Sequence, residues 1–152
     1  MEVIHHGEQP EWRSDTEPWR LPIRFAVNRD SGAETISVWQ HYYTGEHRAP
    51  LHWHETEEVL IFLDVEGDGY VWYDDREYPI RSNCSVVIPP HVVHSFGMHG
   101  PGRMRTLSIL PDADARPGPR VYPEGEEAPH IPPPDQWPTR APAGSAGGRP
   151  RG

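Results

Sequence analysis

Residues 45–58 read GEHRAPLHWHETEE, and this stretch decides how the rest of the chain is interpreted. On a β-strand alternate side chains point to the same side, so His52 and His54 present both imidazoles to one face, with Trp53 on the other. Two imidazoles placed in this way can bind one metal ion, and Glu58, at the start of the next expected strand, can add a carboxylate. Glu57 is an alternative carboxylate, but on a strand it would face away from the site.

A second stretch, residues 89–94, reads PPHVVH and offers a further imidazole. His94 would start a strand directly after a turn that two prolines stiffen. Three neutral imidazoles and one carboxylate suit Fe²⁺, Ni²⁺, Mn²⁺ or Zn²⁺ and leave coordination positions open for water, substrate or dioxygen. We therefore predict one divalent metal ion bound by His52, His54, Glu58 and His94.

Together these stretches resemble the two motifs of the cupin superfamily, G-x5-H-x-H-x3-E-x6-G and G-x5-P-x-G-x2-H-x3-N. All four metal-ligand positions match, and so does the proline, at Pro89. The glycine positions are looser: Gly45 and Gly67 stand one and two residues further from the ligands than usual, and Asn83, His91 and Met98 replace the other motif residues. The resemblance covers residues 45–98 and implies an antiparallel β-barrel of the jelly-roll type.

The pattern of the whole chain agrees with an all-β fold. Short runs rich in β-branched and aromatic residues recur between Gly, Pro, Asn and Asp, and the pair Asp74-Asp75 is typical of a hairpin turn. No segment keeps a helical period beyond two turns. We predict strands at residues 23–27, 34–43, 51–54, 58–65, 69–73, 76–80, 85–88, 94–98 and 103–109.

Composition sets the boundaries of the barrel. Residues 111–152 hold eleven of the 19 prolines and few large apolar residues, which predicts an extended or disordered tail. Residues 1–20 are polar but contain Trp12 and Trp19; this arm packs across the barrel or a partner subunit, or else it is loose. The predicted organisation is an arm at 1–20, a cupin-type barrel at 21–110 and a Pro/Gly-rich tail at 111–152.

Charge and residue content limit the binding partners, the chemistry and the cellular compartment that fit this chain. The formal net charge of -9 argues against a nucleic-acid partner, and the absence of lysine excludes Schiff-base chemistry. One cysteine, Cys84, excludes an internal disulfide and fits a reducing compartment. No apolar run approaches the length of a membrane span, and the N-terminus lacks the pattern of a signal peptide. We expect a cytoplasmic protein without a membrane partner, and a homodimer because an exposed edge strand invites pairing.

Several side chains are candidates for a substrate pocket. Phe96 and Met98 share the strand face of His94. His41 shares a face with Trp39 and Tyr43, which either lines the cavity or forms an outer aromatic patch. Leu60 and Phe62, on the face of Glu58, are either pocket or core, with core favoured. Tyr70 and Trp72 lie on one face of their strand, so at least one of them is a candidate for the pocket. Arg103 and Arg105 share a strand face and could hold a substrate carboxylate, but a surface position is favoured.

The resemblance implies an enzyme rather than a single reaction. We predict a metal-dependent enzyme acting on a small, largely hydrophobic or aromatic substrate. The leading hypothesis is a dioxygenase, with Fe²⁺ as the favoured metal and Glu58 shifting from ligand to catalytic base. One alternative is a metal-dependent cyclase or isomerase resembling polyketide cyclases. A second alternative is a non-enzymatic, small-molecule-binding cupin.

Overall fold

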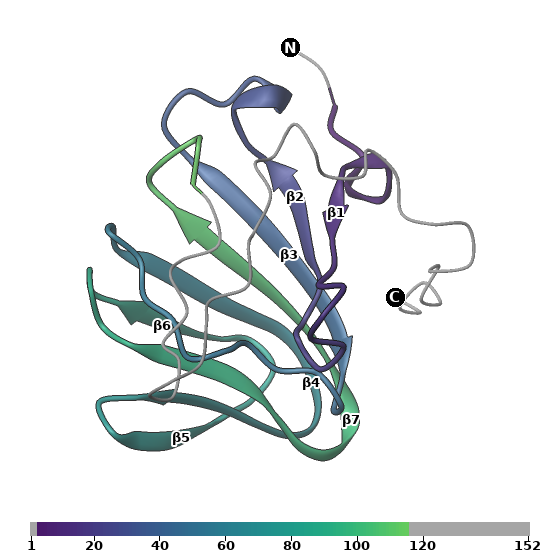
Figure 1. Cartoon of the computed structure of the whole chain (residues 1–152), viewed down its shortest axis with the longest axis vertical. Helices are drawn as coiled ribbons and strands as arrows, with labels where there is room; N and C mark the ends of the chain where they lie inside the picture. The colour runs from purple at the N-terminus through teal and green to yellow at the C-terminus, as the bar shows by residue number, and fades with distance from the viewer. Residues whose placement is uncertain (1–2, 116–152) are drawn as a thin grey trace.

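The computed structural model describes residues 3–115, and β-strands dominate them. Two short 3-10 helices, η1 (His6–Glu8) and η2 (Arg29–Ser31), are the helical elements of this part of the chain. None of the helices among these residues is long and apolar enough to cross a bilayer. The strands are β1 (Glu11–Trp12), β2 (Ile23–Val27), β3 (Ser37–Thr44), β4 (Glu58–Tyr73), β5 (Arg76–Ile80), β6 (Cys84–Ile88) and β7 (His94–Leu110) (Figure 1).

All the strand pairs are antiparallel, in the order β1-β2-β3-β7-β4-β5, with β6 also paired to β4. The long strands β4 and β7 form the centre. Their first contact joins Val59 to Ile109 and their last joins Tyr73 to His94. One half of this ladder is flanked by β3 and β6, and the other half by β5. This arrangement confirms the predicted all-β antiparallel barrel.

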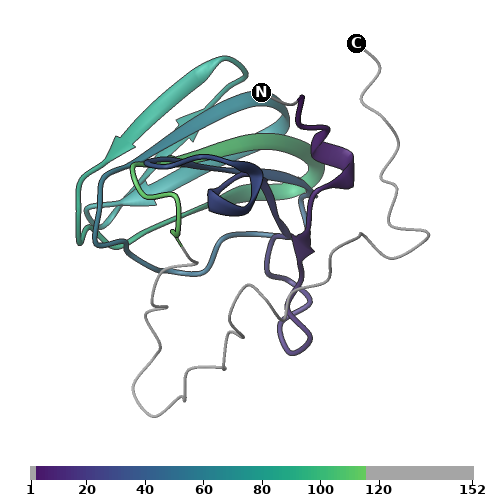
Figure 2. The same cartoon turned by 90° about the horizontal axis from the view of Figure 1, so that it is seen from above.

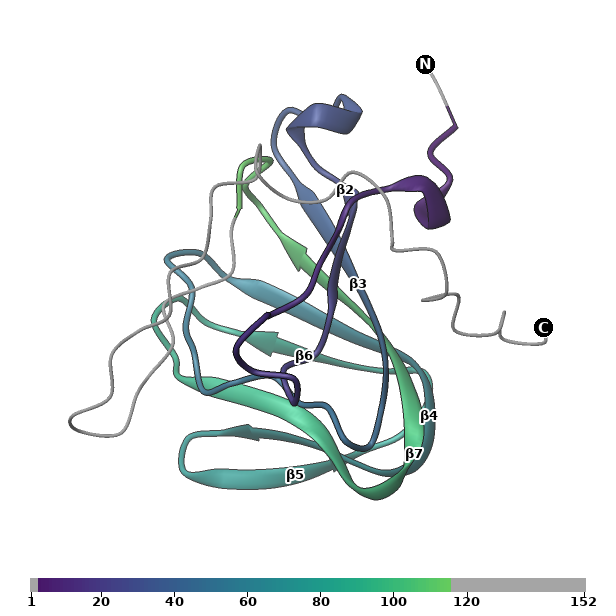
Figure 3. The same cartoon turned by 45° about the vertical axis from the view of Figure 1, so that its right-hand side comes forward.

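The ladder of β4 and β7 bends over on itself near Gly67 and Gly102, and Figure 3 shows both strands curving from one layer to the other. Both glycines have positive φ, 132° and 151°. A Cβ atom on Gly102 would overlap the carbonyl oxygen of Glu66 in the facing strand. Only glycine allows the backbones to approach so closely with these angles. The sequence analysis divides each partner at this bend, into strands at 58–65 and 69–73 and at 94–98 and 103–109. The structure instead has two continuous bent strands, β4 and β7.

Other local predictions can be compared directly. The strands predicted at 23–27 and 76–80 match β2 and β5, and Asp74-Asp75 forms the turn after β4 with φ of 52° and 57°. The strand predicted at 51–54 is wrong. Only His52 pairs there, through an isolated bridge to His94, and the carbonyl oxygen of His54 instead accepts a hydrogen bond from the N–H of His91 in the turn before β7.

The apolar core lies between the two layers and includes Phe25, Leu60, Phe62, Phe96 and Met104, each no more than 2% exposed. The N-terminal segment packs against this barrel through β1, whose Trp12 is buried, and it lies along one side of the sheets in Figure 2. Backbone hydrogen bonds from Leu21 to Arg48 and from Arg48 to Trp19 fix it in place. The part of the proline-rich tail from residue 116 on lies outside the described residues.

Candidate metal centre

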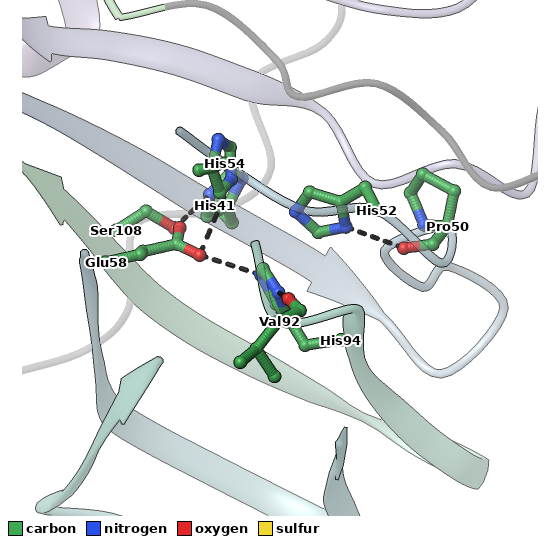
Figure 4. Close-up of polar contacts among 8 residues, drawn as sticks. All are labelled: His41, Pro50, His52, His54, Glu58, Val92, His94 and Ser108. Atoms are coloured by element: carbon green, nitrogen blue, oxygen red, sulfur yellow. Dashed lines mark hydrogen bonds and ion pairs between the residues drawn. The ribbon is translucent and has the colours of Figure 1, made fainter. Parts of the chain in front are cut away.

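Four side chains converge inside the barrel as predicted: His52, His54, Glu58 and His94 each offer a ligand atom, and these atoms lie within 4.8 Å of one another (Figure 4). All four are buried, with exposed fractions of 9% or less. His52 and His54 come from the loop before β4, Glu58 is the first residue of β4, and His94 is the first residue of β7. The local backbone therefore places two ligands in a loop and two at strand starts.

The bend of the central ladder brings the last two ligands together. Glu58 starts β4 beside the end of β7, whereas His94 starts β7 beside the end of β4. In a flat sheet these positions would lie at opposite ends of the ladder. In the barrel, Oε2 of Glu58 lies 2.8 Å from Nε2 of His94. His52 joins them because its backbone N–H and C=O bond those of His94.

Backbone carbonyls fix the tautomers of two histidines. Nδ1 of His52 lies 2.7 Å from the oxygen of Pro50, and Nδ1 of His94 lies 2.9 Å from the oxygen of Val92. A carbonyl only accepts hydrogen bonds, so each Nδ1 carries the proton. Each Nε2 lone pair is then free to bind a metal, an arrangement that is typical of metal-ligating histidines.

The hydrogen-bond partners of His94 and His54 also favour a bound cation. With Nδ1 of His94 protonated, Nε2 directs either a lone pair or a second proton at the Glu58 carboxylate, 2.8 Å away. A lone pair would repel the carboxylate, and a second proton would create a buried imidazolium. In addition, Nε2 of His54 is buried without a hydrogen-bond partner. Buried polar atoms rarely stay unpartnered. A divalent cation between these atoms satisfies all of them.

The electrostatics agree with this donor set. Burial alone would raise the pKa of Glu58, but the hydrogen bond with His94 and the neighbouring imidazoles outweigh it and lower the pKa to about 2. Burial holds the pKa of His52 well below its usual value, with a further contribution from His94, and burial also lowers that of His54. Near neutral pH Glu58 is therefore a carboxylate and His52 and His54 are neutral imidazoles, the forms that bind metals.

A pocket of about 340 Å³, counted with its open mouth, adjoins these ligands. His52 and Glu58 form part of its lining, so the metal centre and the pocket are continuous. The other lining residues are Arg20, Leu21, Ile23, Trp39, His41, Ala49, Pro50, Phe96 and Ser108. Most of this wall is apolar, as in sites for small organic molecules.

Three of the four predicted pocket residues, Trp39, His41 and Phe96, line this cavity, and the face of β3 that carries Trp39 and His41 is the inner one. Met98 does not line it. Its side chain is 6% exposed and belongs to the core, and its Cε atom lies next to the bend glycines. Two residues beyond Phe96, β7 has already carried Met98 away from the pocket and towards the bend.

The structure also places the other residues that the sequence analysis considered for the site. Leu60 and Phe62 are fully buried in the core, and Tyr70 and Trp72 do not line the pocket. Arg103 and Arg105 form ion pairs with Glu66 and Asp64 on the outer face. Glu57 and His91 are exposed.

Two polar residues of the pocket escape the sequence analysis: Arg20 and Ser108. Arg20 belongs to the predicted arm, where nothing in the sequence distinguishes it from a surface arginine. Ser108 could have been found, because it is a polar residue at an inward position of β7, where the pattern alternates between buried and half-buried residues.

Burial also lowers the pKa of His41, the pocket histidine that is not a candidate ligand. It is 3% exposed, and burial lowers its pKa to about 4, so its ring is neutral near neutral pH. Its Nδ1 lies 3.0 Å from the oxygen of Pro22 and its Nε2 lies 3.0 Å from Oγ of Ser108. The ring is therefore held rigidly between the N-terminal segment and β7.

Comparisons with known proteins agree with this architecture. The polyketide cyclase RemF from Streptomyces resistomycificus superimposes with a TM-score of 0.67 at 19% identity, over 82% of this chain and 88% of that one. A cupin-like protein from Thermotoga maritima gives a TM-score of 0.59 at 16% identity, over 80% and 89%. A cupin 2 domain-containing protein from Halorhodospira halophila gives 0.58 at 20% identity, over 72% and 74%.

These likenesses, at 20% identity or less, concern the fold. No curated protein matches the sequence. The family model described as Cupin domain matches residues 38–110, which include all four candidate ligands and the strands β3 to β7 that position them. Residues 38–110 of this protein form a cupin domain.

Proposed function

We propose that this protein is a metal-dependent enzyme that rearranges a small, largely apolar or aromatic carbonyl compound by moving protons, as a cyclase or isomerase does. The observation that carries the proposal is the continuity of the metal centre with the pocket: His52 and Glu58 belong to both. A molecule in the pocket therefore lies next to the ligands. A metal that only stabilised the fold would need no such opening.

The four ligands would hold one divalent cation, which when bound supplies Lewis-acid polarisation of a substrate oxygen and, if it is iron, also activation of dioxygen. The protein supplies the rest. Trp39 and Phe96 provide apolar walls that exclude water and orient a ring. Glu58 is ionised near neutral pH and lines the pocket, so its carboxylate can accept a proton from a substrate carbon beside a polarised carbonyl.

A proton-transfer reaction needs a group that accepts and returns a proton, and the pocket contains one in the Glu58 carboxylate. The polyketide cyclase of the same fold is in keeping with this choice. The dioxygenase hypothesis, with iron as the metal, stays a prediction, because the same ligand set accepts iron and no described residue distinguishes the two reactions. Homodimer formation and a cytoplasmic location also stay predictions.

The test combines metal identification with two activity assays. The full-length protein would be purified without added metal, its metal identified by elemental analysis, and the loaded protein incubated with linear poly-β-ketone analogues and, separately, with catechols, flavonoids and thiols. We expect cyclised or isomerised products without oxygen uptake. Oxygen consumption that depends on one of these substrates would instead establish the dioxygenase. Absence of turnover together with tight substrate binding would favour a non-enzymatic binding protein.

A further inference from the structure

One polar pair in the pocket has no part in holding the cation. Ser108 on β7 and His41 on β3 are 1% and 3% exposed, and both line the pocket beside Glu58. Figure 4 shows Ser108 and His41 hydrogen-bonded to each other close to the carboxylate. A serine and a histidine buried at inward positions cost desolvation, and apolar residues would pack there without that cost.

The direction of each hydrogen bond in this pair follows from its neighbours. The carbonyl of Pro22 only accepts, so Nδ1 of His41 carries the proton and donates it across 3.0 Å. Because the ring is neutral, Nε2 has a lone pair and no proton. The bond of 3.0 Å between Nε2 and Ser108 must then run from the serine hydroxyl to the histidine. Ser108 has committed its one proton, and its oxygen can offer only lone pairs to the pocket.

We propose that Ser108 anchors the substrate by accepting a hydrogen bond from a substrate hydroxyl, and that His41 is the positioning residue that fixes this polarity. The pocket therefore selects a hydrogen-bond donor, a phenol or enol hydroxyl on an apolar ring system, over the corresponding ether, ketone or carboxylate. The substrate class named here is that of the proposed enzyme and rests on the proposed function. The hydrogen bonds that join Pro22, His41 and Ser108 do not depend on the metal.

Discrimination of this kind is strong in a buried site. A substrate hydroxyl finds a partner in Ser108, whereas a methyl ether leaves the serine oxygen facing an apolar group and adds bulk. Sites built to hydrogen-bond a ligand hydroxyl reject the analogue that lacks it because their buried polar groups are then left unpaired. We expect about a tenfold preference for the hydroxyl compound, the size of one neutral hydrogen bond.

The experiment is a two-by-two comparison of ligand and protein. The probes are 1-naphthol and 1-methoxynaphthalene, which share a ring system and differ in one hydrogen-bond donor. Dissociation constants would be measured by calorimetry for the wild-type protein with its own metal, for Ser108→Ala, and for Ser37→Ala as the control. Ser37 is another fully buried serine, on β3 and outside the pocket. A cycle of this design cancels any steric or metal-binding difference between the probes that is common to all variants.

The wild-type protein and Ser37→Ala should each bind 1-naphthol about tenfold more tightly than 1-methoxynaphthalene, and Ser108→Ala should bind them within about twofold. A preference of the same size in Ser108→Ala would overturn the proposal. If Ser108→Ala does not fold, His41→Gln serves instead. It removes the fixed lone pair on Nε2, and an unchanged preference in that variant would equally contradict the proposal.

Repeating the titrations after metal removal with a chelator separates this inference from the proposed function. A Ser108-dependent preference that persists without metal supports the anchor, whatever the reaction is. A preference that disappears from the wild-type protein and from Ser37→Ala when the metal is removed assigns the hydroxyl to the metal centre and overturns the role of Ser108.

Discussion

Glu58 and His94 lie next to opposite ends of the β4–β7 ladder, yet Oε2 of Glu58 and Nε2 of His94 are 2.8 Å apart. The bend near Gly67 and Gly102 closes this gap. The two glycines therefore matter to the site although they are not part of it. The cluster of candidate metal ligands is a consequence of how sharply the central ladder folds over, and we expect damage to the bend to displace these ligands.

Gly102→Ala tests whether the bend requires glycine. A Cβ atom at this position would overlap the carbonyl oxygen of Glu66, and the φ of 151° strains any residue other than glycine. We expect the free energy of unfolding, measured by urea denaturation, to fall by about 2 kcal/mol or more. Gly7→Ala is the matched control, because a Cβ atom there meets nothing within 4 Å. Equal stability of the two variants would show that the bend tolerates a side chain.

Glu58→Gln tests the carboxylate. The substitution keeps the shape of the side chain and removes the charge that a divalent cation requires, so metal affinity should fall by about a hundredfold or more. Glu57→Gln makes the same chemical change one residue earlier, at an exposed position, and should leave the affinity within about twofold of wild type. Competition with a fluorescent chelator measures both. Matching losses in the two variants would point to overall charge rather than to a ligand.

His41 should make the protein sensitive to mild acid. Its pKa is about 4 in the folded protein and 6.5 as the ordinary value, so between these pH values the unfolded chain binds a proton that the native protein does not. Stability is therefore lost as pH falls from about 6.5 to about 4, by roughly 3 kcal/mol at the lower limit.

Urea denaturation at pH 7 and pH 4 measures this loss. In His41→Gln, which cannot titrate, the decrease in unfolding free energy between the two pH values should be smaller than in wild type by about that amount. An identical decrease in both proteins would mean that His41 is not buried in its neutral form.

The ligands were predictable because they depend on short-range rules. Alternation and spacing place His52, His54 and Glu58 together, and the proline-stiffened turn precedes His94. The face that His52 and His54 share survives even though residues 51–54 are not a strand, because one bridge from His52 to His94 is enough to orient the loop. Likewise, aspartate's tolerance of positive φ makes Asp74-Asp75 a recognisable turn.

The features that the sequence could not predict depend on contacts between residues that are far apart in the chain. Residues 66–68 and 99–102 interrupt the strand pattern, and only the close approach of Glu66 and Gly102 in space shows that the ladder continues through them. The same bend removes Met98 from the pocket. Arg20 reaches the pocket because hydrogen bonds between Leu21, Arg48 and Trp19 hold the N-terminal segment against the barrel, a contact that no local pattern encodes.

The central claim is that three imidazoles and one carboxylate bind a single cation. The most direct measurement is the metal content per chain of the full-length protein, His52→Ala and His94→Ala, each purified in parallel and analysed by elemental mass spectrometry, with folding checked by circular dichroism. We predict about one divalent metal ion per wild-type chain and less than about a tenth of that in each folded variant. Full metal content in both folded variants, or none in wild type after incubation with Fe²⁺, Zn²⁺, Ni²⁺ and Mn²⁺, would contradict it.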